Sequence, residues 1–177
     1  MKIAIFALLL VVFASCGTKV AYTNQIKEEF GLESETNIKK VQFYTSSTII
    51  MERSKVSGNQ GTGSDGSLVT NQSKQQDRVI IPVNTKGVFE KFGPNGEVVV
   101  RFEIGVGKTV TFAMRPNTNT GKYYFYADWK QGKGGEITYG NEIYTIDSSA
   151  GNAYLMVVLK KLNKTKRKDR VVKGMKV

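Results

Sequence analysis

The chain has 177 residues, 40% of them hydrophobic and 10% aromatic, which is enough for one domain with a packed core. Its formal net charge is +11 at neutral pH, and it contains no histidine and a single cysteine. This composition excludes an intramolecular disulfide and a cysteine-rich metal site, and it removes the commonest general base and transition-metal ligand. Neither a cofactor nor a metal is expected.

The N-terminus has the composition of an export signal. Lys2 precedes an unbroken apolar run, 3–13, which is shorter than the roughly 20 residues that a membrane-spanning helix needs. We therefore assign 1–15 to a signal peptide. The sequence Phe13-Ala14-Ser15-Cys16 resembles a bacterial lipobox, although Phe13 stands where leucine is usual. The resemblance implies cleavage before Cys16 and attachment of lipid such as palmitate to it; a plain secretory signal or an uncleaved apolar tail is the alternative.

Residues 16–37 are expected to form a lipid tether and a short helix. The tether would run over 17–22. Thr23 is a suitable N-cap for a helix over 25–30, and Gly31 is suited to end it.

Residues 38–161 carry the pattern of a β domain. Alternating apolar and polar residues are separated by glycine-rich turns, which is typical of antiparallel sheets. Strands are expected at 39–54 (one strand, or two with a break near Ser46), 78–83, 87–92, 97–104, 109–114, 122–129, 136–139, 142–146 and 153–159. The segment 57–76, rich in Gly, Ser, Asn and Gln, is expected to be a flexible loop. The predicted fold is all-β, an antiparallel sandwich or barrel with one short N-terminal helix and a basic disordered C-terminal tail.

The sequence Gly105-Val106-Gly107-Lys108-Thr109 resembles the end of a phosphate-binding loop. Such a loop needs a first glycine where Phe102 stands, and a helix after the lysine. A strand pattern follows instead, so we predict a turn between two strands.

Aromatic residues are concentrated in the sequence KYYFYADWK, 122–130. Alternation puts Tyr123, Phe125 and Trp129 on one face of a strand and Tyr124 and Tyr126 on the other. One face must belong to the core. Tyr124, Tyr126 and Trp129 are the candidate recognition surface, for instance a stacking platform for a sugar ring; packing on both faces is the alternative.

The C-terminal tail, 162–177, belongs to a strongly basic stretch. Repulsion between like charges predicts disorder there. The stretch is a candidate contact for an anionic surface, such as phospholipid head groups or lipopolysaccharide, or else a solvated tail. Its basic residues, opposed by Asp169 alone, are Lys160, Lys161, Lys164, Lys166, Arg167, Lys168, Arg170, Lys173 and Lys176.

Carboxylates are the remaining candidates for acid–base chemistry. They show no spacing that predicts a paired acid and base. The carboxylates within the predicted β domain that we considered are Glu90, Glu97, Glu103, Asp128, Glu136, Glu142 and Asp147.

The stretch 154–161 running into the basic tail, together with the lipobox-like start, resembles small envelope lipoproteins of Bacteroidota. This resemblance supplies no activity; it implies an acyl anchor in the outer membrane. The absence of acidic residues in Gly17-Thr18-Lys19 favours the periplasmic face. We expect a non-enzymatic envelope binding or assembly component whose partners are the membrane, anionic lipid, lipopolysaccharide or an envelope protein. The alternatives are a secreted basic module for nucleic acid or anionic polymer, although nucleic acid is not the expected partner, and a periplasmic carboxylate-dependent hydrolase.

Overall fold

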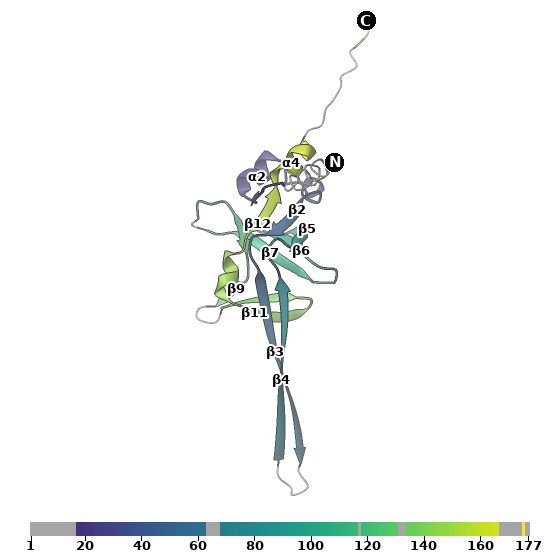
Figure 1. The fold of residues 1–177 in the computed structure, drawn as a ribbon, viewed down its shortest axis with the longest axis vertical. Coiled ribbons are helices and arrows are strands. Elements are labelled where there is room, and N and C mark those ends of the chain that lie inside the picture. Colours follow the sequence, from purple (N-terminus) through teal and green to yellow (C-terminus); the bar gives the residue numbers. More distant parts are fainter. Residues whose placement is uncertain (1–16, 63–67, 117, 131–133, 167–174, 176–177) are drawn as a thin grey trace, which may run out of the picture.

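The computed structural model describes residues 17–62, 68–116, 118–130, 134–166 and 175. They form two antiparallel sheets, which confirms the all-β prediction (Figure 1). The seven-stranded sheet has the order β1 (Lys19–Ala21), β12 (Leu155–Val158), β2 (Gln42–Thr45), β5 (Lys86–Phe92), β6 (Val98–Arg101), β7 (Thr109–Met114) and β8 (Tyr123–Phe125). The five-stranded sheet has the order β4 (Leu68–Ile81), β3 (Ile49–Thr62), β11 (Glu142–Ile146), β10 (Gly134–Tyr139) and β9 (Asp128–Lys130).

The seven-stranded sheet curls until its two edges meet. Isolated bridges join Thr23 to Lys122 and Tyr124 to Tyr154, and the Phe125 amide donates to the Ala153 carbonyl at 2.7 Å. The curled sheet encloses an aromatic core because alternate residues of every strand point inward. Its fully buried aromatic side chains are Tyr22, Phe43, Phe112 and Tyr123.

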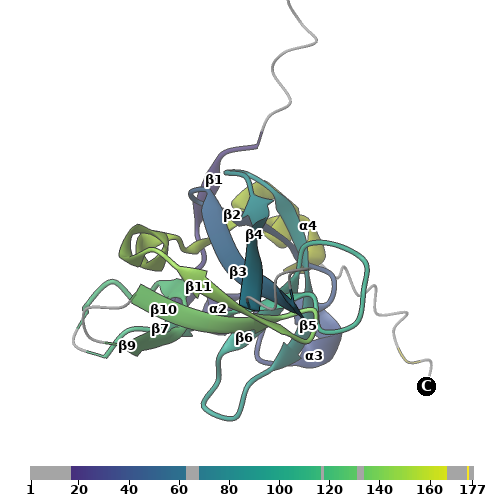
Figure 2. The same cartoon turned by 90° about the horizontal axis from the view of Figure 1, so that it is seen from below.

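The five-stranded sheet, in which β10 and β11 lie side by side (Figure 2), contributes one face to the same core. Its buried side chains include Ile49, Met51, Tyr144 and Ile146, and they belong to one hydrophobic cluster with those of the curled sheet. The other face remains open, so this sheet has a dry side and a solvent side.

A long two-stranded ribbon, β3–β4, replaces the flexible loop predicted at 57–76, and that prediction was wrong for the residues described. The two strands pair continuously from Ile49↔Ile81 to Thr62↔Leu68. Backbone pairing joins the two strands along this whole length, and neither strand contains proline. Pairing of β3 with β11 is at Met51 and Glu52, so the ribbon beyond them extends about 30 Å at about 3.3 Å per residue. Helices α2 (Asn24–Glu29) and α4 (Leu159–Lys166) lie at the opposite end of the molecule (Figure 1).

The N-terminal segment is part of the fold from its first described residue, so the predicted tether over 17–22 was wrong. β1 pairs with β12, and Tyr22 is fully buried between Phe43 and Tyr123. Helix α2 (Asn24–Glu29) begins after Thr23, whose side-chain oxygen accepts from the Ile26 amide at 3.2 Å. A second short helix, α3 (Glu35–Ile38), follows it and was not predicted.

The C-terminal segment forms helix α4 (Leu159–Lys166) directly after β12. The prediction of a disordered tail from residue 162 was therefore wrong for 162–166. Leu162 is buried and Leu159 packs against the core. These two leucines, three residues apart, form the apolar side of the helix. The prediction of disorder rested on the charged residues and did not take these leucines into account.

The turns and hairpins were predicted more accurately. β5 and β6 pair across the turn at 93–96, β10 and β11 pair across Gly140-Asn141, and Gly105–Lys108 is the connection between β6 and β7, as expected. β6 ends at Arg101, however, three residues earlier than predicted, and the Ile104 side chain is 93% exposed.

Candidate functional site

The aromatic segment passes from one sheet to the other. β8 ends at Phe125, Tyr126-Ala127 cross between the sheets, and β9 begins at Asp128. The single strand predicted over 122–129 was therefore wrong. Tyr123, Phe125 and Ala127 are buried, but the crossing turns Trp129 away from their environment and leaves it 41% exposed. The three candidate recognition residues, Tyr124, Tyr126 and Trp129, consequently line one hollow of about 520 Å³. We call this the aromatic hollow.

Two glycines make room for the indole ring of Trp129. A Cβ on Gly135 would lie 2.9 Å from Cε3 of Trp129, and a Cβ on Gly151 would lie 3.0 Å from its Cζ2. The ring of Phe125 meets the indole edge-on at a centroid distance of 6.3 Å. The indole is therefore held by its surroundings, with part of its surface left open to solvent.

Arg115 completes the wall of the aromatic hollow. Its guanidinium lies 4.3 Å from the centroid of the Tyr124 ring and donates to the Gly151 carbonyl. Tyr154 packs edge-on against Tyr124 at 6.0 Å. Sequence reasoning missed Arg115 and Gly151, because they are 36 residues apart and no local pattern shows that the fold brings them together.

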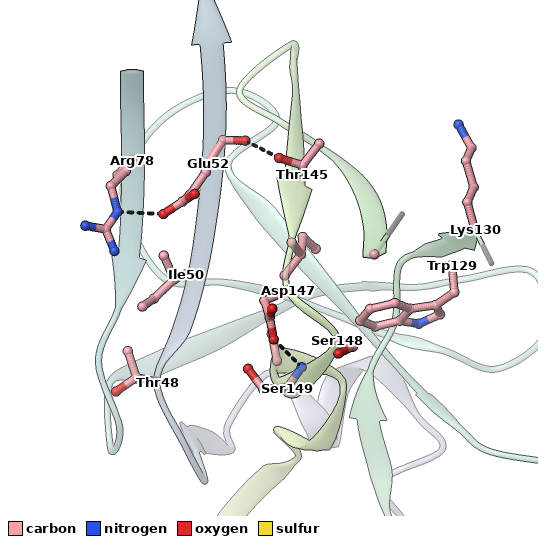
Figure 3. Close-up of a pocket in the computed structure, with 13 residues that line it drawn as sticks. Thr48, Ile50, Glu52, Arg78, Trp129, Lys130, Thr145, Asp147, Ser148 and Ser149 are labelled. Atoms are coloured by element: carbon pink, nitrogen blue, oxygen red, sulfur yellow. Dashed lines mark hydrogen bonds and ion pairs between the residues drawn. The ribbon is translucent and has the colours of Figure 1, made fainter. Parts of the chain in front are cut away.

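A second and larger hollow, of about 810 Å³, lies on the other side of Trp129 (Figure 3). We call it the polar hollow. It extends over the open face of the five-stranded sheet to the 3₁₀ helix η2 (Ser148–Asn152). Trp129 and Ser148 line both hollows. The polar side chains that line this hollow are Thr48, Glu52, Arg78, Lys130, Thr145, Asp147, Ser148 and Ser149.

The charged groups of the polar hollow are bound to neighbouring groups, either inside the hollow or next to it. Arg78 Nε lies 2.9 Å from Glu52 Oε1, as Figure 3 shows, and Lys130 Nζ lies 2.6 Å from Glu136 Oε2. The hydrogen bond from Lys130 to Glu136 raises the pKa of Lys130. The Ser149 amide donates to Asp147 Oδ1 at 2.8 Å and lowers the pKa of that carboxyl. Both shifts favour the charged forms of Lys130 and Asp147 at neutral pH.

The carboxylates considered for a hydrolase are dispersed among other partners. Glu90 pairs with Arg101, and Glu142 pairs with Arg53. The pKa of Glu97 is lowered by backbone amides and by Asn95, and the pKa of Glu103 by hydrogen bonds from Lys108 and Tyr139. A general acid at neutral pH needs a raised pKa, so these two carboxyls and Asp147 are shifted in the wrong direction for that role.

The predicted anionic-surface residues are described in part. Lys160 and Lys161 lie on α4 and are exposed, and Lys161 lines a small hollow of about 180 Å³ together with Lys40. The backbone of Lys164 and Lys166 also belongs to α4. Cys16, Arg167, Lys168, Arg170, Lys173 and Lys176 lie outside the described residues.

Gly17 is tightly packed against β12. A Cβ at this position would lie 2.5 Å from Cγ1 of Val158, the residue before α4. The backbone next to Cys16 is thus adjacent to the first turn of the basic helix.

The described part of the chain contains neither a membrane-spanning helix nor a cluster of metal-ligating side chains. Within it, no helix has the length and apolar character needed to cross a membrane. The same residues contain no group of three or more acidic or cysteine side chains placed to hold a metal ion. A scan against protein-family models and searches of curated proteins and of solved structures found no match.

Proposed function

We propose that this chain is a lipid-anchored, non-enzymatic binding component of the cell envelope, and that it holds its ligand at the surface around Trp129. The observation that carries the binding role is the mounting of this indole between Gly135 and Gly151, beside two hollows. Rigid aromatic side chains lose little conformational entropy on contact, so they are effective anchors for ligands.

The position of the N-terminal segment supports attachment of the domain directly to a membrane. Acylation of Cys16 would bring lipid to the residue next to Gly17, which is packed on Val158. Lys160 and Lys161 follow on the adjacent helix, and a lysine near an anionic bilayer contributes about 1 kcal/mol. In this arrangement the ribbon points away from the membrane (Figure 1).

The absence of catalysis is supported by the chemistry of the chain. It contains no histidine, and the lowered pKa values of Glu97, Glu103 and Asp147 suit charged structural groups. The charged groups of the polar hollow are paired with neighbours on the same sheet face.

The anchor is tested by labelling cells with a palmitate analogue and separating membranes from soluble material. The native chain and a matched Ser15→Ala variant should both incorporate label and sediment with membranes. Cys16→Ala should lose the label, and it should either leave the membrane or persist as a larger precursor. Equal labelling of Cys16→Ala and the native chain would refute the anchor.

A further inference from the structure

The two hollows beside Trp129 differ in chemistry and meet at the same indole. The aromatic hollow is walled by ring faces and by Met114, whereas the polar hollow presents hydroxyl groups and paired charges. A ligand that crosses Trp129 therefore needs one apolar face and a rim of hydrogen-bonding groups. Volumes of about 520 and 810 Å³ lie in the range of small-ligand pockets, about 300–1,000 Å³.

The formal charges lining the polar hollow cancel. Arg78 and Lys130 are balanced by Glu52 and Asp147, and Arg78 is already bound to Glu52 at 2.9 Å. A strongly anionic ligand would gain little there, since it would have to compete with the existing ion pairs. Nucleic acid and phosphorylated ligands are therefore disfavoured in the polar hollow.

Hydroxyl groups in the polar hollow can form the hydrogen bonds to a ligand that its paired charged groups do not form. Thr145 donates to the Glu52 carbonyl at 3.0 Å, which leaves its oxygen able to accept another bond. Ser148 stands beside the indole at the junction of the two hollows (Figure 3). Hydroxyl groups can donate and accept, so they match a ligand that carries many hydroxyls of its own.

We infer that the surface around Trp129 is a binding site for a neutral glycan. The apolar C–H face of a sugar ring stacks on the exposed indole, which is flanked by Tyr126. The hydroxyl groups of the glycan reach Ser148 and Thr145. This inference rests on the proposed binding role of the same surface and adds the class of ligand. Gly135 and Gly151 fix the position of the Trp129 indole, since a side chain at either residue would displace the ring.

The chain contains a single tryptophan, so its fluorescence reports this site alone. The full chain in detergent is titrated with two neutral probes, cellotetraose and fully N-acetylated chitotetraose. At least one should change the emission of Trp129 saturably. The dissociation constant should differ by less than about twofold between about 50 and about 500 mM NaCl, because no net charge is neutralised.

Two variants and one control locate the effect. Tyr126 is 53% exposed, so Tyr126→Ala should leave the fold intact and weaken binding about tenfold. Gly151→Ala should shift the emission of the free protein and weaken binding, because the new methyl group crowds the indole. Ile104→Ala, on the β6–β7 connection, removes an exposed apolar side chain elsewhere and should bind like the native chain.

Heparin and a single-stranded DNA oligonucleotide are the contrasting probes. A change in emission with these anions alone, suppressed by salt, would overturn the glycan assignment but retain a binding role for the surface. A flat response to both neutral probes and both anions would overturn the glycan assignment and remove the support for that role. Neither result depends on Cys16, because the palmitate experiment tests the anchor separately.

Discussion

The two sheets of this protein both contain large apolar side chains but differ in how far they bury them. The curled seven-stranded sheet encloses Phe43, Phe112 and Tyr123, which are all fully buried. The five-stranded sheet buries one face and leaves the other open, with Ile143 64% exposed. The difference indicates that the closed sheet contributes the fully buried rings of the shared core and that the open face of the five-stranded sheet supplies the exposed surface. Trp129 lies where the chain crosses from one sheet to the other.

The largest expected effect comes from breaking the closed sheet. Phe112→Ala removes a fully buried ring and should lower the free energy of unfolding by about 3–5 kcal/mol. Ile143→Ala on the open sheet is the matched substitution and should change it by less than about 0.5 kcal/mol. Urea unfolding of both variants measures the difference. Equal losses in the two variants would contradict the division of roles between the sheets.

The second prediction concerns the backbone of the open sheet. Gly134 has a φ of +78°, and a Cβ there would collide with the Ile146 carbonyl oxygen. Gly134→Ala should therefore cost about 2–3 kcal/mol, because strain in φ adds to the displacement of a paired strand. Gly140, at φ +60°, would meet the Lys108 side chain only at 3.6 Å, so Gly140→Ala should cost about 1 kcal/mol. Thermal unfolding of the two variants compares them, and equal losses would show that φ alone decides the cost.

The features that sequence predicted well are local. Alternation of apolar and polar residues identified the strand at 109–114. The strands predicted at 87–92 and 97–104, and at 136–139 and 142–146, correspond to two hairpins of the structure. Tyr124, Tyr126 and Trp129 were selected because aromatics exceeded what one face of a strand needs, and the structure places all three on one hollow.

The features that sequence missed depend on contacts between distant segments. The register of the β3–β4 ribbon follows from backbone pairing. Polar residues permit this pairing, but their sequence contains no pattern that predicts it. Tyr22 was assigned to a tether because its burial comes from Phe43 and Tyr123, which lie far along the chain. Gly135 and Gly151 look like ordinary turn residues, and only the position of Trp129 gives them a role.

The smallest expected effect tests how the two sheets are joined. Tyr139 of β10 donates to Glu103 Oε1 at 2.8 Å, and Lys108 Nζ lies 3.0 Å from the same oxygen. Glu103 and Lys108 belong to the connection between β6 and β7, so this carboxylate links the closed sheet to the open one. Hydrogen bonds from Lys108 and Tyr139 lower the pKa of Glu103, while burial is the main cause that raises the pKa of Tyr139.

A lowered pKa in the folded state fixes the sign of the pH dependence. The stabilisation is present above the unfolded value of about 4.3 and is lost as the pH falls through the folded value. Since the side chains of Glu103 and Lys108 are partly exposed, Glu103→Gln should cost no more than about 1 kcal/mol at pH 7. Its unfolding free energy should approach that of the native chain in acid, at a pH well below the lowered pKa of Glu103, where the native carboxyl is protonated. Tyr139→Phe should retain part of this pH dependence through Lys108. Urea unfolding at several pH values measures these differences, and a gap that persists in acid would mean that Glu103 acts through packing, so that the link between the sheets is not electrostatic.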